Sequence, residues 1–152
     1  MILRNKFQIK DSLKTLLASQ SLAVLATQNA AQPYANLVAF AAAADLKSLF
    51  FATARSTRKF ANISKNPRVS LVIDNRSNRV ADFREAMAVT ALGKAKEIGS
   101  RAKKKVQALY LSKHPYLREF VLSPSCALLK VEVEKYIIVY RFQNVLELNP
   151  RK

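Results

Sequence analysis

Short apolar runs separated by polar turns occupy the first half of the chain. The runs at 21–27, 34–42 and 48–53 contain no charged residue, and polar clusters at 28–33 and 43–47 lie between them. Runs of this length, rich in β-favouring residues and bounded by turn signals, predict buried strands with short connections. Ahead of them, residues 11–19 place leucines at helical spacing behind Asp11 or Ser12 as N-cap, which predicts a short amphipathic helix.

The second half mixes strands with helical patterns. The predicted strands cover 69–73, 86–98 and 126–140. The predicted helices cover 57–65, 100–112 and a short segment that begins at Leu117. The first of these helices should end at Asn66, because the residue before a proline disfavours the helical conformation. Within the strand predicted over 126–140, residues 129–134 alternate apolar and charged side chains, so one face of that strand should lie in water.

Six strands with short connections and few helices predict a mainly β fold, an antiparallel barrel with flanking helices. The polar cluster at 74–78 is a predicted turn, and Gly93 inside a strand predicts a bulge or a close backbone approach. No repeat, linker or low-complexity tract divides the chain, so residues 1–152 are predicted to form a single domain.

The composition excludes several kinds of site. With two glycines, one cysteine and one histidine, the chain has no glycine-rich phosphate loop, no internal disulfide and no ordinary Cys/His zinc site. Cys126 is expected to be a small buried apolar residue, and His114 a surface or capping residue rather than a catalytic base. Nucleophilic machinery of the Ser-His-Asp or Cys-His type is therefore poorly supported.

The net charge of +16 is the most unusual global property. It favours contact with polyanions and keeps a nucleic-acid-binding function open. The dense cluster at 101–105 has no aromatic residues interleaved with it, so a solvated helix face is the favoured interpretation and nucleic acid is not the expected partner. The longest apolar run, 37–44, is too short for a membrane helix, and residues 1–10 lack the apolar region of a secretory signal, so a cytoplasmic protein without membrane contact is expected.

The stretch 50–68 carries the candidate chemistry. An apolar strand runs into Ser56, Thr57, Arg58 and Lys59, which stand at the start of a predicted helix. Hydroxyls, adjacent cations and the free N–H groups of a helix start all favour a phosphate. The alternative is an exposed helix start with two ordinary cations.

Segments spread over nearly the whole chain resemble the pyridoxamine-phosphate-oxidase-like, FMN-binding split-barrel family. They are Leu-Ala-Val-Leu-Ala-Thr at 22–27 with Gln-Pro at 32–33, Leu-Phe-Phe-Ala-Thr at 49–53, Ser-Thr-Arg-Lys at 56–59, Asn-Pro-Arg-Val-Ser-Leu at 66–71 and Ala-Leu-Gly-Lys-Ala at 91–95. The resemblance implies a six-stranded antiparallel Greek-key split barrel and a homodimer with FMN at the subunit interface. It also implies an oxidoreductase that transfers hydride or electrons to or from an unidentified small-molecule substrate.

The resemblance also implies a set of cofactor-binding residues. Arg58 and Lys59 would hold the FMN phosphate. Hydroxyl or backbone bonds would come from Ala52, Thr53, Ser56 and Thr57. The backbone beneath the isoalloxazine would be that of Asn36, Leu37, Val38 and Ala39. The flavin or its ribityl chain would be reached by Asn75, Arg76 and Ser77, for which a plain polar turn is the alternative.

The chain departs from the family pattern in two places. It has no arginine near Asn36 or Leu37, and it lacks the tail containing tryptophan, arginine and histidine with which the true oxidases bind their substrate. Oxidation of pyridoxamine phosphate itself is therefore not the expected activity. One alternative is a split barrel that uses a deazaflavin, or haem held by His114 or by an outside ligand. The other is a basic barrel that binds nucleic acid or another polyanion without a flavin.

Overall fold

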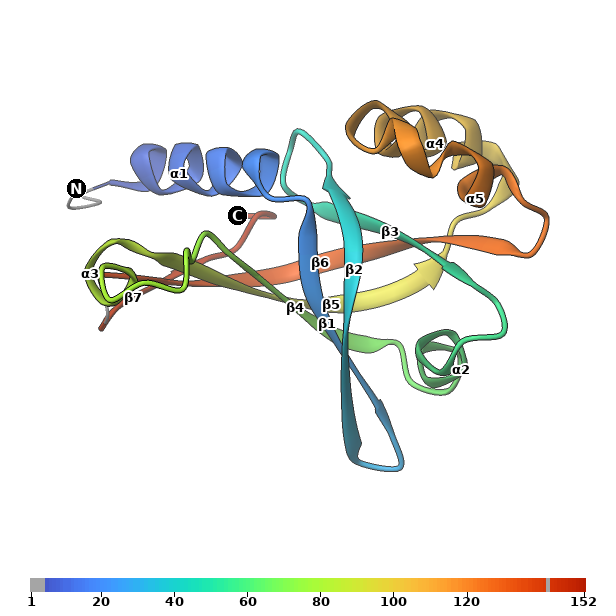
Figure 1. Ribbon diagram of the computed structural model, residues 1–152, viewed down its shortest axis with the longest axis horizontal. Helices are drawn as coiled ribbons and strands as arrows, with labels where there is room; N and C mark the ends of the chain where they lie inside the picture. Colours follow the sequence, from blue (N-terminus) through green and yellow to red (C-terminus); the bar gives the residue numbers. More distant parts are fainter. Residues whose placement is uncertain (1–4, 142) are drawn as a thin grey trace.

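Six antiparallel strands close into a barrel in the computed structural model, which describes residues 5–141 and 143–152. The barrel strands are β1 (Leu22–Asn29), β2 (Gln32–Ala42), β3 (Ser48–Ala54), β4 (Arg68–Asp74), β5 (Met87–Glu97) and β6 (Cys126–Tyr140). Their order is β3-β2-β1-β4-β5-β6, and pairing of β3 with β6 closes the barrel (Figure 1). The order β4-β1-β2-β3 is a Greek key. The predicted fold class is confirmed.

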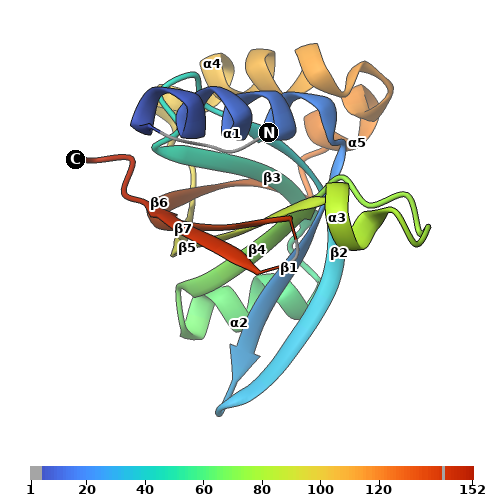
Figure 2. The same cartoon turned by 90° about the vertical axis from the view of Figure 1, so that its left-hand side faces the viewer.

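Helices cover two sides of the barrel. They are α1 (Lys6–Ser19), α2 (Arg58–Lys65), α3 (Asp82–Glu85), α4 (Ser100–Lys113), the 3-10 helix η1 (Pro115–Leu117) and α5 (Arg118–Leu122). Helices α1 and α4 lie on one side and α2 on the other (Figures 1 and 2). Helix α2 ends at Asn66 as predicted. Helix α1 begins well before the predicted position, because Asn5 rather than Asp11 or Ser12 is its N-cap and accepts a bond from the Gln8 N–H.

Two elements of the structure have no counterpart in the sequence prediction. Strand β7 (Asn144–Leu148) pairs with the second half of β6, whose first half pairs with β3 on the same edge. Helix α3 is a single turn whose Asp82 carboxylate accepts bonds from the backbone N–H groups of Ser77, Asn78 and Arg79. These bonds hold the pKa of Asp82 below its ordinary value. Both elements are too short to show a periodic pattern.

The apolar core lies in two layers. Alternate strand residues such as Phe40, Phe51 and Leu129 fill the barrel interior. Their neighbours on the outer face, among them Ala41 and Phe50, pack beneath α4. This second layer fixes α4 and the helices after it against β2 and β3. No helix among the described residues has the length and apolar character needed to cross a bilayer.

His114 and Cys126 are both buried. The burial of Cys126 confirms the prediction. The predicted surface position of His114 is wrong: its side chain is fully buried, with Nε2 2.7 Å from the Phe40 carbonyl oxygen. Its capping role is confirmed, since the His114 backbone N–H bonds to the Tyr110 carbonyl at the end of α4. The chain turns into η1 directly afterwards, which folds the ring back against β2.

Lys113 connects α4 with α1, and its burial leads us to expect an unusual pH dependence of stability. Its Nζ donates to the Leu17 carbonyl at 2.8 Å, and burial lowers the pKa of Lys113 to about 8. A lysine in the unfolded chain keeps its proton up to about pH 10.4. Between pH 8 and 10 the unfolded state therefore binds more protons, and the free energy of unfolding should rise with pH. Urea denaturation across this range measures the slope, which we expect to be smaller in Lys113→Met.

The trend should reverse above pH 10. Burial raises the pKa of Tyr110 to about 12 and also raises that of Tyr136, so these phenols ionise first in the unfolded state. Burial also lowers the pKa of Lys59, so Lys59 likewise makes the free energy of unfolding rise with pH. The difference between the wild-type protein and Lys113→Met isolates the contribution of Lys113. An identical slope in the wild-type protein and in Lys113→Met would contradict the assignment.

Candidate functional site

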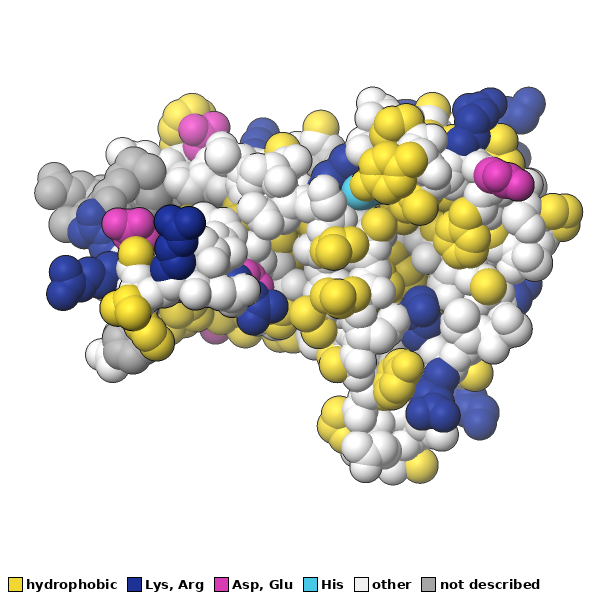
Figure 3. Space-filling view, in the orientation of Figure 1, with side chains coloured by type: hydrophobic (Ala, Val, Ile, Leu, Met, Phe, Trp, Pro, Cys, Tyr) yellow, Lys and Arg dark blue, Asp and Glu magenta, His cyan; other side chains and the backbone are white. Residues whose placement is uncertain are grey.

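A cavity of about 310 Å³ lies on the outer side of the barrel, between β2, β3, the start of α2 and the helices α4, η1 and α5. Figure 3 shows the surface hollowed between β2 and α5. The cavity is lined by Leu37, Val38, Ala39, Ala52, Thr53, Ala54, Thr57, Lys59, Tyr110, Leu117 and Phe120. The predicted cofactor-binding residues among them are Leu37, Val38, Ala39, Ala52, Thr53, Thr57 and Lys59. The structure therefore brings residues of three predicted segments to one place.

The cavity exists because the outer face carries small side chains here. Residues 40 and 51 are paired across β2 and β3 and point into the barrel, so their neighbours Ala39 and Ala52 point outward. Methyl groups at these positions leave room that larger side chains would fill. The Tyr110 hydroxyl donates to the Ala39 carbonyl at 3.0 Å, which fixes the helical wall at this distance from β2.

Lys59 is the cation that faces this cavity. Its side chain is half-buried in the first turn of α2, and burial lowers the pKa of Lys59. Within the described part of the chain, no carboxylate forms an ion pair with it. A partly desolvated ammonium group without a counter-charge is stabilised by a bound anion. The arrangement therefore favours a negatively charged ligand at this end of the cavity.

Two hydroxyls stand beside Lys59 at the start of α2. Thr53 Oγ1 and Thr57 Oγ1 are 2.8 Å apart, and each lies within donating distance of the Ala54 carbonyl, at 3.1 and 3.0 Å. The Thr57 oxygen also caps α2 by accepting the Phe60 N–H at 3.3 Å. The N-terminus of a helix carries a partial positive charge that favours anions. An anion bound here would meet an ammonium group, a hydroxyl pair and a helix start together.

Arg58 and Ser56 do not line the cavity. Both are exposed, and the Arg58 guanidinium lies over the ring of Tyr34 on β2, 5.3 Å from its centre. Successive residues of a helix point about 100° apart, so adjacent cations at a helix start face different directions. Within one chain the predicted pair is divided: Lys59 faces the cavity and Arg58 covers Tyr34.

Asn36 carries a buried oxygen that lacks a partner. Its side chain is on the face of β2 opposite to Leu37, and Oδ1 forms no hydrogen bond with any described residue. An unsatisfied buried acceptor costs roughly 1–3 kcal/mol. A donor from a ligand, a water molecule or a second chain would remove this cost.

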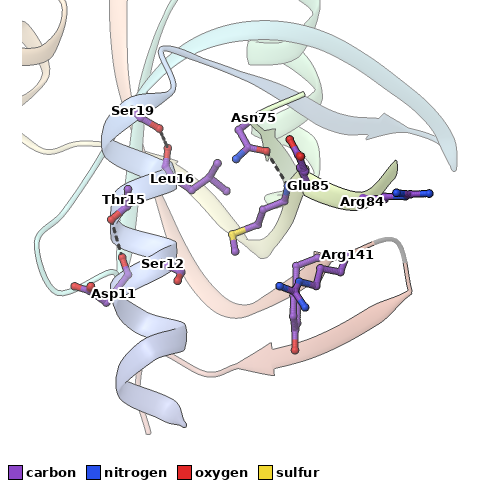
Figure 4. A pocket seen from close by; sticks show the side chains of 11 residues that line it. Asp11, Ser12, Thr15, Leu16, Ser19, Asn75, Arg84, Glu85 and Arg141 are labelled. Carbon is purple, nitrogen blue, oxygen red and sulfur yellow. Dashed lines mark hydrogen bonds between the residues drawn. The ribbon is translucent and has the colours of Figure 1, made fainter. Parts of the chain in front are cut away.

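The polar turn predicted to reach the flavin lies at the far end of the barrel. Asn75 lines another cavity, of about 480 Å³, between α1 and the ends of β4, β5 and β6 (Figure 4). Its Oδ1 accepts the Met87 N–H at 2.7 Å. Arg76 pairs with Asp74 at 3.2 Å, and the Ser77 hydroxyl bonds to Asp82 at 2.8 Å. Within one chain, these three residues stabilise the turn and α3 and do not contact the Lys59 cavity.

This larger cavity is a poorer anion site. Acidic and basic residues both line it, namely Asp11, Glu85, Arg84 and Arg141. In Figure 4 the Arg84 side chain points away from the cavity. The charges around this larger cavity have mixed signs and do not converge on one point, whereas the Lys59 cavity presents a cation without a counter-charge.

Sequence reasoning missed the helical wall of the Lys59 cavity. Tyr110, Leu117 and Phe120 lie on predicted helices, but nothing in the sequence connected them with β2 and β3. The one available signal was the apolar face of the helix predicted over 100–112, which had to cover some part of the sheet.

Comparisons with known proteins support the family and the fold. The family model for pyridoxamine 5'-phosphate oxidase matches residues 9–140. A comparison with curated protein sequences finds no significant match.

Solved structures with the same fold differ in what their names say they bind. A haem-binding protein from Mycobacterium smegmatis superposes with a TM-score of 0.84 at 16% identity, covering 99% of this chain and 60% of that one. An FAD-binding protein from Mesorhizobium loti superposes with a TM-score of 0.68 at 16% identity, covering 85% of this chain and 90% of that one. General Stress Protein 26 from Bacillus anthracis superposes with a TM-score of 0.69 at 21% identity, covering 93% of this chain and 98% of that one. This chain thus spans about 60% of the length of the haem-binding protein, and at these identities the likeness shows the fold alone.

Proposed function

The chain belongs to the pyridoxamine 5'-phosphate oxidase family, and we propose that it is a homodimeric flavoprotein that binds FMN in the Lys59 cavity and acts as an oxidoreductase on a small substrate. The observation that carries the proposal is the half-buried, unpaired Lys59 beside the hydroxyls of Thr53 and Thr57. These groups suit a terminal phosphate, which accepts several charge-assisted hydrogen bonds at once. FAD ends in an adenosine group instead, and the cavity gives no support for an adenine site.

The residues of the cavity divide into two roles. Lys59 would hold the phosphate, and Thr53 and Thr57 would add to this by turning their hydroxyl protons from the Ala54 carbonyl to the phosphate oxygens. Ala39 and Ala52 leave space along the strands, and the apolar wall of Tyr110, Leu117 and Phe120 would exclude water. FMN, when bound, supplies the hydride or electron transfer, and the protein supplies binding and orientation.

The size of the cavity supports a shared site. At about 310 Å³ it is near the lower end of the roughly 300–1,000 Å³ typical of ligand pockets, and it is open on one side. A second copy would have to provide the remaining wall. Contacts from Asn75, Arg76 or Ser77 to the flavin would have to come from that second copy, since these residues lie far from the cavity in their own chain.

The outer face of β1 and β2 is the surface we propose for dimerisation. Strand pairing places Leu22, Val24, Ala26, Ala35, Leu37 and Ala39 together on this face. All are apolar, and Leu22 and Leu37 are 53% and 63% exposed. The face continues directly into the Lys59 cavity, because Leu37 and Ala39 belong to both. A dimer formed here would therefore cover the cavity.

Leu37→Asp should disrupt this dimer. Burying an unpaired carboxylate at an interface costs several kcal/mol, so we expect the dimer dissociation constant to rise at least about a hundredfold. FMN affinity should fall with it. Light scattering coupled to size exclusion measures the mass, and the matched control is Val145→Asp on β7, which is also exposed and lies away from this face. Leu37→Asp protein that remains a dimer with unchanged FMN affinity would contradict the proposed surface.

The absorption spectrum tests the cofactor directly. We expect the purified protein, or the protein titrated with FMN, to show a flavin spectrum and to release fluorescent FMN on denaturation. A colourless protein that does not bind added FMN would overturn the proposal. Binding of nucleic acid that falls steeply with salt would then favour the polyanion-binding alternative.

Haem is the second candidate, because one protein of the same fold is named for binding it. The residues of this chain offer little for the iron. His114 is fully buried, its Nε2 bonds to the Phe40 carbonyl, and its Nδ1 lies 3.4 Å from the Tyr116 hydroxyl. Ligation through His114 would require one of these two ring nitrogens to give up its present contact and reach the iron from a fully buried position. The same spectrum decides, since bound haem gives an intense Soret band.

A further inference from the structure

A separate apolar cavity of about 430 Å³ lies between α1, the connection from β2 to β3, and α4. Figure 1 shows the two helices on either side of this connection. The cavity is lined by Lys14, Leu17, Ala18, Ala41, Ala42, Ala43, Ala44, Leu46, Leu109, Ser112 and Lys113. It shares no lining residue with the Lys59 cavity. Any ligand bound here would therefore be distinct from the one proposed for that site.

The wall is apolar because of the alanine run at 41–44. Four consecutive methyl side chains occupy the end of β2 and the turn that follows it, where larger side chains would fill the space. Leu17, Leu46 and Leu109 complete the wall. Such a lining removes aliphatic groups from water but cannot orient a polar ligand by itself.

The charged groups of the cavity are cationic, and Ser112 adds one neutral hydroxyl. Lys113 Nζ donates to the Leu17 carbonyl at 2.8 Å and lies 3.9 Å from the centre of the Phe40 ring. An ammonium group has three N–H donors, so at least one remains beside the bond to Leu17 and the contact with the Phe40 ring. Among the described residues that line the cavity none is acidic, and Lys14 adds a second positive charge. Burial lowers the pKa of Lys113 to about 8, which is consistent with an ammonium group that lacks a counter-ion.

We propose that this cavity binds an aliphatic carboxylate, with the carboxylate on Lys113 and the hydrocarbon chain against the alanine and leucine wall. A carboxylate accepts a charge-assisted hydrogen bond from the remaining N–H of Lys113 and supplies the missing negative charge. A phosphate suits the cavity less well, because neither a helix N-terminus nor a hydroxyl pair stands beside Lys113. The aliphatic part of the ligand follows from the apolar wall, because burying a hydrocarbon chain there removes apolar surface from water.

The comparison of three ten-carbon ligands tests the proposal in the wild-type protein. Isothermal titration with decanoate, decan-1-ol and decyltrimethylammonium separates the contribution of the negative charge from that of the chain. We expect decanoate to bind with one site per chain and about ten- to a hundredfold more tightly than the alcohol. The cation should bind more weakly than the alcohol. Decanoate binding no tighter than decanol would overturn the proposal.

Two variants locate the site. Lys113→Met should remove the preference for decanoate over decanol, whereas Lys104→Met, with the same charge change on the exposed face of α4, should keep it. Ala18→Phe places a ring at an exposed lining position and should weaken both ligands at least about tenfold. A preference that survives in Lys113→Met, or binding that is unchanged in Ala18→Phe, would overturn the assignment. If Lys113→Met does not fold, the wild-type comparison and Ala18→Phe decide.

Discussion

Lys59→Met protein is expected to bind FMN about ten- to a hundredfold more weakly than the wild type. A hydrogen bond to a charged group contributes roughly 1.5–3 kcal/mol, which corresponds to that range of dissociation constants. Lys59 is the cation that lines the cavity, and methionine keeps much of its apolar stem while removing the ammonium group. Quenching of FMN fluorescence during titration measures the dissociation constant, and far-UV circular dichroism checks that the barrel is intact.

Two neighbouring cations on α2 provide the controls for Lys59→Met. Lys65→Met removes the same charge at the opposite end of the helix and should leave FMN affinity within about twofold of the wild type. Arg58→Met should have a smaller effect than Lys59→Met, because the Arg58 guanidinium lies over Tyr34 outside the cavity. If Arg58→Met abolished binding while Lys59→Met did not, the phosphate would lie on the Tyr34 side of α2, and the cavity assignment would be wrong.

The strands and the anion corner could be predicted because their signals are local. The uncharged runs at 21–27 and 48–53 have no favourable environment other than a core. The helix predicted over 57–65 differs from α2 by one residue at its start, where Thr57 is the N-cap, and Asn66 before a proline sets its end. Lys59 could be placed at a helix start for the same reason.

The rest of the site depends on directions and distances that a sequence does not contain. The rotation of α2 against β1 decides whether Arg58 or Lys59 faces the cavity. Contacts such as the hydrogen bond from Asn62 to Thr27 fix this rotation. The burial of His114 depends on where the chain turns back after α4. The placement of Asn75 at the far end of the barrel follows from the length of β4, which carries the turn away from α2.

Gly93→Ala is expected to lower the free energy of unfolding by about 3 kcal/mol, at the upper end of the usual cost of overpacking. Leu92 pairs with Lys135 and Gly93 with Val133, so Glu134 is an extra residue on β6 and the strand is bulged at this point. The predicted bulge is confirmed. A Cβ at position 93 would overlap the carbonyl group of Glu132, and backbone on the facing strand can yield only by disturbing the ladder. Urea denaturation of both proteins measures the difference in the free energy of unfolding.

The second glycine is a matched control for Gly93→Ala. Gly99 is the N-cap of α4, and a Cβ there would meet no atom within 4 Å, so Gly99→Ala should cost about 1 kcal/mol or less. Gly93 does not have a positive φ, so backbone strain cannot account for a difference between the two variants. An equal loss of free energy of unfolding in both variants would mean that the backbone near Glu132 moves away from the added Cβ at little cost, which would contradict the prediction. A large loss at Gly93 alone would show that the stability of the fold depends on this close approach. The approach bears on the site as well, because the bulged strand β6 pairs with both β5 and β3, and β3 carries Thr53 into the cavity.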